Sequence, residues 1–88
     1  MTEIPKEEFL SVRVSNPDAV LWLGEADSVS SRNLQGDFDI LPQHANFITI
    51  IQNNPIIIQI RGGEKKEFHF DSAIIYTYKD SVQIFANI

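Results

Sequence analysis

The sequence has 88 residues, enough for one domain with a modest hydrophobic core, and we interpret residues 1–88 as that single domain. Twelve acidic side chains outnumber seven basic ones, and the net charge of −5 disfavours binding to nucleic acid or to an anionic membrane surface. The absence of cysteine excludes disulfides, thiolate zinc sites and cysteine nucleophiles.

The N-terminal stretch "MTEIPKEEF" has acidic residues where a secretory signal needs a basic end and an apolar run. No stretch approaches the roughly 20 apolar residues of a membrane-spanning helix. We therefore expect a soluble chain that does not insert into a membrane and that reaches one only through a partner. Residues 5–9 fit either one helical turn or an irregular lead-in to the first strand.

Short strands separated by turns follow along the chain. Alternation of apolar and polar residues predicts a first strand at 10–14, and "SNPDA" (15–19) favours a turn after it. Residues 20–23 and 26–30 are predicted as two short strands hinged at Gly24, where the missing Cβ permits a bulge or a close backbone approach.

The second half of the sequence continues in the same way. The Gly62-Gly63 pair predicts a hairpin, because glycine readily adopts the positive φ of a tight reversal. Lys79-Asp80 is predicted as a turn between the last two strands. Further strands are predicted at 36–40, 47–51, 56–60, 67–70, 74–78 and 82–86.

No window has a sustained helical period, and strands at this spacing are typical of an all-β fold. We predict a two-layer antiparallel β-sandwich of about ten short strands. The residues expected in its core are Val12, Val14, Val29, Phe38, Ile40, Ile58, Ile60, Phe70 and Ile84.

The stretch "GDFDILPQHA" (36–45) concentrates the candidate chemistry. His44 with Asp37 or Asp39 would make a general-base pair, but no motif such as Gly-x-Ser-x-Gly supplies a nucleophile. A metal site would need three or four converging ligands, and the only other imidazole, His69, is far away in the sequence. We therefore expect no catalytic residue, no metal and no cofactor. The open alternatives are a solvated strand face with His44 bonded to backbone in a turn, and a docking edge.

Three motifs follow one another at a distinctive spacing: the Pro17-Asp18 turn, an aromatic residue ahead of Gly-Glu-Ala (22–26), and Gly-acid-x-x-Ile-Leu-Pro-x-His-Ala (36–45). Together they resemble the N-terminal β-sandwich domain of the epsilon subunit of bacterial F-type ATP synthase, the counterpart of the mitochondrial delta subunit. The chain departs from the family pattern at 71–73, usually Gly-Gly, and at Asn46, usually proline. Family members commonly continue into two C-terminal helices, and we expect this chain to lack them.

The resemblance implies a noncatalytic rotor subunit at the foot of the central stalk, which couples ion-driven rotation to ATP synthesis on other subunits. Its partners would be the gamma subunit and the polar loops of the c-ring, at the cytoplasmic face of the inner membrane. A free-standing interaction module that diverged from the synthase is the alternative, and a small hydrolase or metal protein is the enzyme-class rival. By resemblance, the c-ring-facing residues would be Asp37 and Asp39, and the gamma-facing residues Leu41, Pro42, His44 and Ala45.

Overall fold

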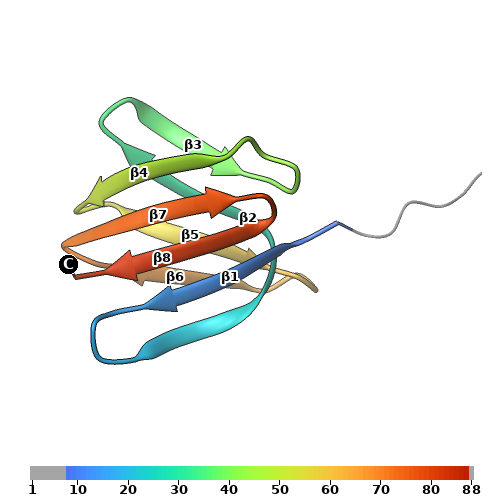
Figure 1. The fold of residues 1–88 in the computed structure, drawn as a ribbon, viewed down its shortest axis with the longest axis horizontal. Helices are drawn as coiled ribbons and strands as arrows, with labels where there is room; N and C mark the ends of the chain where they lie inside the picture. The colour runs from blue at the N-terminus through green and yellow to red at the C-terminus, as the bar shows by residue number, and fades with distance from the viewer. Residues whose placement is uncertain (1–7, 88) are drawn as a thin grey trace, which may run out of the picture.

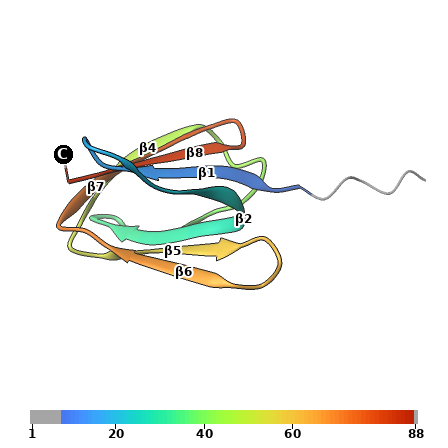
Figure 2. The same cartoon turned by 90° about the horizontal axis from the view of Figure 1, so that it is seen from below.

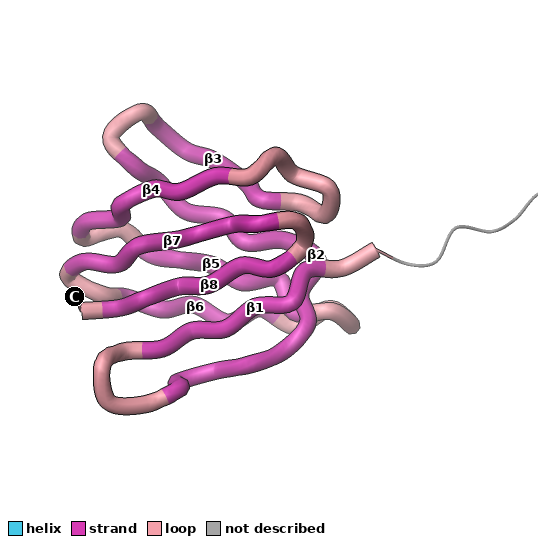
Figure 3. The backbone as a smooth tube through the Cα atoms, viewed as in Figure 1, coloured by secondary structure: helices cyan, strands magenta, loops and turns pink. Residues whose placement is uncertain are grey.

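A computed structural model describes residues 8–87, and every regular element in that range is a β-strand (Figure 3). Of residues 5–9, for which a helical turn was considered, 5–7 lie outside the described residues, and 8 and 9 belong to no helix or strand. The predicted all-β class is confirmed, with eight strands in the described range in place of about ten. They are β1 (Leu10–Ser15), β2 (Val20–Asn33), β3 (Gly36–Ile40), β4 (Phe47–Gln52), β5 (Pro55–Ile60), β6 (Lys65–His69), β7 (Ser72–Tyr78) and β8 (Ser81–Ala86).

The strands form one curled sheet that folds into two layers. Its order is β4-β7-β8-β1-β2-β5-β6, with β3 paired to β2. The layer with β4, β7, β8 and β1 faces the layer with β5, β6 and the second half of β2 (Figures 1 and 2). All pairs are antiparallel except β1 with β8, which is parallel. Tight turns force antiparallel pairing on sequence neighbours, whereas strands from the two ends of the chain are free of that constraint.

Strand β2 links the two layers, and the predicted break at Gly24 is wrong. Residues Val20–Asn33 form one continuous strand that pairs with β1 through its first half and with β3 and β5 through its second. The pairing with β5 shifts register between Ala26 and Ser28. Such a bulge increases local bending and twist, so the strand changes layer there without ending.

The core lies between the layers and is almost entirely aliphatic. Six of the nine predicted core residues are fully buried, while Phe38, Ile60 and Phe70 pack against the core from its rim. The prediction missed Ile51, Ile56 and Ile75 in strands where most neighbouring residues are apolar, because alternation gives no clear inward face there. It also left out Leu10 and Val82, although their strands alternate and place them inward. The fully buried aliphatic residues among those described are Leu10, Val12, Val14, Ala26, Val29, Ile40, Ile51, Ile56, Ile58, Ala73, Ile75, Val82, Ile84 and Ala86.

The predicted turns are present. Gly62 and Gly63 both have positive φ, 104° and 110°, and join β5 to β6. The carboxamide oxygen of Asn16 accepts hydrogen bonds from the amides of Asp18 and Ala19, both at 2.8 Å, in the turn after β1. This side-chain bonding is the reason that asparagine favours reversals.

Side chains close the curled sheet between β3 and β4. The rings of Phe38 and Phe47 meet edge to face with centroids 5.3 Å apart, and Asn33 Nδ2 donates to Thr49 Oγ1 at 3.0 Å. The β2–β3 hairpin consequently lies at one end of this seam, and the β3–β4 loop lies at the other (Figure 1).

Candidate docking surfaces

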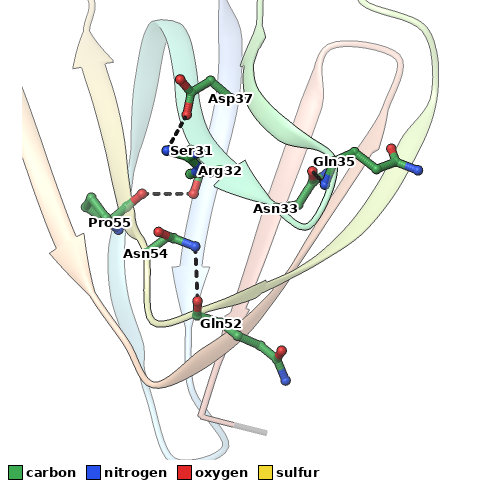
Figure 4. A network of polar contacts seen from close by, with 8 residues as sticks. All are labelled: Ser31, Arg32, Asn33, Gln35, Asp37, Gln52, Asn54 and Pro55. Atoms are coloured by element: carbon green, nitrogen blue, oxygen red, sulfur yellow. Dashed lines mark hydrogen bonds and ion pairs between the residues drawn. The ribbon is translucent and has the colours of Figure 1, made fainter.

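The two aspartates of β3 lie on its solvent side, opposite the core-facing Phe38 and Ile40. Asp37 Oδ1 is 3.8 Å from Arg32 Nη1 of β2, and both side chains are mostly exposed (Figure 4). Asp39 accepts a hydrogen bond from Ser30 Oγ at 2.5 Å. We refer to Asp37 and Asp39 together as the acidic strand face.

Neighbouring polar contacts fix the backbone around this face. Ser31 Oγ donates to the carbonyl oxygen of Pro55 at 2.8 Å, and Asn54 Nδ2 donates to the carbonyl oxygen of Gln52 at 3.1 Å (Figure 4). The first bond ties β2 to the start of β5, and the second braces the turn between β4 and β5. The backbone that carries the acidic strand face is thus fixed by hydrogen bonds. Its two carboxylates are exposed to water, where they can accept hydrogen bonds from a cationic group of a partner.

The loop of residues 41–46, here called the docking loop, joins β3 to β4. The amide of His44 donates to the carbonyl oxygen of Leu41 at 3.0 Å. His44 Nδ1 lies 2.6 Å from the carbonyl oxygen of Ala45, and because a carbonyl can only accept, Nδ1 donates. The imidazole also meets the Phe47 ring edge to face, at 5.5 Å between centroids. His44 therefore has the backbone-bonded turn geometry of the first open alternative.

The docking loop still offers apolar surface to a partner. The side chain of Leu41 is 53% exposed, Ala45 is exposed, and Pro42 is half-buried. Among residues 8–87, no hydrogen bond or ion pair joins His44 to either carboxylate of the acidic strand face: His44 bonds to Ala45, while Asp37 and Asp39 bond to side chains of β2. A general-base pair between them is not assembled in this structure.

Within residues 8–87, no three His, Asp or Glu side chains are grouped so that they could hold a metal ion. Within the same residues, no helix is long and apolar enough to cross a membrane.

Sequence reasoning missed an apolar surface on the solvent side of β4 and β7. Ile48 and Ile50 of β4 are 65% and 60% exposed, although they lie in the middle of a strand. Across the β4–β7 pairing, Ile48 lies opposite Tyr76, and Ile50 lies opposite Ile74. We define Ile48, Ile50, Ile74, Tyr76 and Tyr78 as the apolar outer face.

A signal for this surface was present in the sequence. The runs "FITII" and "IIYTY" are apolar at both alternating positions, whereas a strand with one wet side normally alternates with polar residues. Tyr76 and Tyr78, on the same side of β7, are 39% and 48% exposed. The excess apolar character indicates a second covered side, which the isolated domain does not supply.

The β2–β3 hairpin extends the apolar outer face. Leu34 at its tip is 98% exposed, and a groove of about 510 Å³ runs between it and β4. Phe47, Ile48, Ile50 and Ile74 line this groove together with Leu34. Contiguous exposed apolar surface of this kind typically marks a site of protein–protein contact.

Comparison with known families matches residues 9–88 to the family described as ATP synthase, delta/epsilon chain, beta-sandwich domain. The ATP synthase epsilon chain of Brevibacillus brevis is 29% identical over 77 residues, covering 88% of this chain and 58% of that protein. The epsilon chain of Leptospira borgpetersenii serovar Hardjo-bovis is 33% identical over 76 residues, covering 85% of this chain and 58% of that protein. The chain thus spans just over half the length of these relatives.

Solved structures share the fold at lower identity. A chain in the Euglena gracilis mitochondrial ATP synthase structure (OSCP/F1/c-ring) superposes with a TM-score of 0.83 at 14% identity, covering 97% of this chain and 53% of that one. A chain in the Tetrahymena thermophila mitochondrial ATP synthase structure (central stalk/c-ring) gives a TM-score of 0.76 at 11% identity, covering 96% and 67%. At these identities the superpositions establish the architecture alone.

Proposed function

We propose that this chain, which belongs to the ATP synthase delta/epsilon β-sandwich family, is a noncatalytic central-stalk subunit of an F-type ATP synthase. It would dock on the gamma subunit and on the c-ring, and would couple ion-driven rotation of the ring to ATP synthesis on other subunits. The apolar outer face carries the proposal, because a small acidic domain gains nothing from exposing two isoleucines in mid-strand unless a partner covers them.

The gamma-facing surface would combine the docking loop with the apolar outer face. The loop leads directly into Phe47, which pairs with Thr77 near the end of β7. The predicted residues Leu41, Pro42, His44 and Ala45 thus precede the outward side chains of β4 directly in the chain. A partner laid over both would remove contiguous apolar area from water, which is the main favourable contribution to such association.

The acidic strand face would meet the c-ring. Exposed carboxylates suit a charge-assisted hydrogen bond with a guanidinium of a basic loop, and the net charge of −5 favours such a partner at long range. The acidic strand face lies on β3, and the docking loop follows this strand directly in the chain. One rigid sandwich could thus engage two partners together at the cytoplasmic face of the membrane, held there through the complex.

Co-purification with the gamma subunit tests the proposal. Tagged wild-type chain should capture gamma from a catalytic complex that lacks its own epsilon chain. Ile48→Lys should abolish or strongly weaken capture, because a lysine in the centre of the interface would have to lose its hydration. Leu23→Lys is the matched control: Leu23 is 71% exposed on the half of β2 that pairs with β1, and in the sheet order β1 and β8 separate β2 from β7 and β4.

Equal capture by wild type and Ile48→Lys would remove the apolar outer face from the proposed interface. Failure of the wild-type chain to capture gamma would contradict the central-stalk function itself. The free-standing interaction module would then be the better interpretation of the same apolar surface.

A further inference from the structure

Two non-glycine residues at one end of the sandwich have a left-handed backbone. Gln43 in the docking loop has φ 68°, and Lys79 in the β7–β8 turn has φ 54°. The other described non-glycine residues with positive φ are Asn53 and Asn87, and asparagine tolerates this region far better than glutamine or lysine does. Gln43 and Lys79 therefore require an external reason for their conformations.

That reason is a reciprocal pair of hydrogen bonds between the two segments. The amide of Gln43 donates to Asp80 Oδ1 at 2.7 Å, and the amide of Lys79 donates to Asn46 Oδ1 at 2.9 Å. Each left-handed residue thus gives its backbone N–H to a side chain of the other segment. We call these two bonds the clasp.

The clasp is anchored on the start of β1. The carbonyl oxygen of Asp80 accepts from the amide of Ser11 at 2.8 Å. The side chain of Gln43 reaches Glu8, with Nε2 donating to Oε2 at 2.6 Å. The docking loop is consequently bonded to two segments that are far from it in sequence, the β7–β8 turn and the residues leading into β1, and these two segments are bonded to each other.

We infer that Asn46 and Asp80 are positioning residues that hold the docking loop in the conformation in which Leu41, Pro42 and His44 are presented to gamma. This inference rests on the proposed function. Neither Asn46 nor Asp80 belongs to the predicted contact set, so each acts through the loop. A loop already ordered in its bound conformation loses less entropy on docking and binds more tightly.

The test compares removal of the clasp with its conservative replacement. Asn46→Ala, Asp80→Ala and the double variant remove the acceptors, while Asn46→Asp and Asp80→Asn keep a side-chain oxygen at each position. Asp18→Ala is the control, an exposed aspartate in the turn at the other end of β1. Three quantities are measured for each variant: hydrogen exchange at the amides of Gln43 and Lys79, unfolding in urea, and affinity for a gamma-containing complex that lacks epsilon.

The alanine variants should speed exchange at Gln43 and Lys79 by about tenfold, the effect of losing one net hydrogen bond. Their affinity for gamma should fall by about tenfold, with the urea midpoint changed far less than in a core truncation. The conservative variants should recover most of the affinity. Asp18→Ala should change neither the exchange at these two amides nor the affinity.

Unchanged hydrogen exchange at both amides in the double variant would show that the two hydrogen bonds of the clasp do not protect the amides of Gln43 and Lys79. Faster exchange with unchanged affinity would overturn the positioning role, and so would an affinity loss that follows only from global unfolding in urea. If wild-type chain fails to bind gamma, the proposed function fails and the positioning role with it. The exchange measurement then still decides separately whether the clasp orders the loop.

Discussion

The indole ring of Trp22 lies directly over Gly24: a Cβ built on Gly24 would be 2.6 Å from Cζ2 of Trp22. The two residues are two positions apart in β2 and lie on the same side of the strand. The ring packs against the hydrophobic core from its edge. Glycine at position 24 is therefore required by the close approach of a ring, and the strand continues through it.

Gly24→Ala should destabilise the domain by about 1–3 kcal/mol, because the new methyl group forces the indole away from its packing site. Unfolding in urea measures the change. In a Trp22→Leu background the same substitution should cost much less, since the clash is gone and alanine suits a strand better than glycine. Additive effects of the two substitutions would contradict the contact.

Thr77 should be a site where a substitution stabilises the fold. It is fully buried, and its hydroxyl has no hydrogen-bond partner within residues 8–87. Thr77→Val keeps the shape and removes the unpaired hydroxyl, which should raise the free energy of unfolding by about 1 kcal/mol. Thr77→Ser is the control, because it keeps the hydroxyl and loses a buried methyl group, and it should destabilise. A destabilised valine variant in thermal or urea unfolding would show that the hydroxyl is satisfied.

Ile58→Ala should cost about 2–5 kcal/mol, because Ile58 is fully buried between the layers and its truncation leaves a cavity. Ile57→Ala provides a control in the same strand, since Ile57 lies on the solvent side beside the acidic strand face. Ile57→Ala should lower the free energy of unfolding by less than half as much as Ile58→Ala. Similar losses in urea unfolding would mean that the alternation of β5 between core and solvent is wrong.

The strands that could be predicted best from sequence are those with a clear alternation or a strong turn. Residues 10–14 alternate, and the Gly62-Gly63 reversal fixes its hairpin, so both were predicted close to their observed positions. The predicted break of the strand at Gly24 was wrong. It rested on the local tendency of glycine to interrupt strands, whereas the role of Gly24 depends on where the Trp22 ring packs. The inward residues of β4 and β7 were hidden because both faces of these strands are apolar.

The candidate surfaces were predictable only in part. The alternation of 36–40 correctly placed Asp37 and Asp39 on the solvent side of a strand. The sequence could not show that Arg32 lies beside Asp37, because that pairing depends on the register between β2 and β3. The clasp was out of reach for the same reason, since the docking loop and the β7–β8 turn meet only after β4, β7 and β8 have packed. The proposed contacts of these surfaces with gamma and the c-ring remain predictions.

Asp37→Lys should weaken assembly with the c-ring more than it weakens binding to gamma. The substitution places a cation where the proposed partner presents one, and it also sets this lysine beside Arg32, 3.8 Å from the present carboxylate. Because both side chains of that ion pair are mostly exposed, its loss should change the stability of the fold little. The measurement is binding of the chain, with gamma, to detergent-solubilised c-ring at low and high salt.

Glu64→Lys is the control for this charge reversal, because it makes the same change of charge in the exposed β5–β6 hairpin, remote from β3. It should leave c-ring binding nearly unchanged. Added salt should weaken the wild-type interaction toward the level of Asp37→Lys, because an exposed pair is screened within about 10 Å at 0.1 M salt. If Asp37→Lys and Glu64→Lys reduce c-ring binding equally at low salt, the change in net charge accounts for the loss. Asp37 then makes no specific contact with the ring. If Asp37→Lys leaves ring association intact at low salt, its assignment to the c-ring interface is wrong.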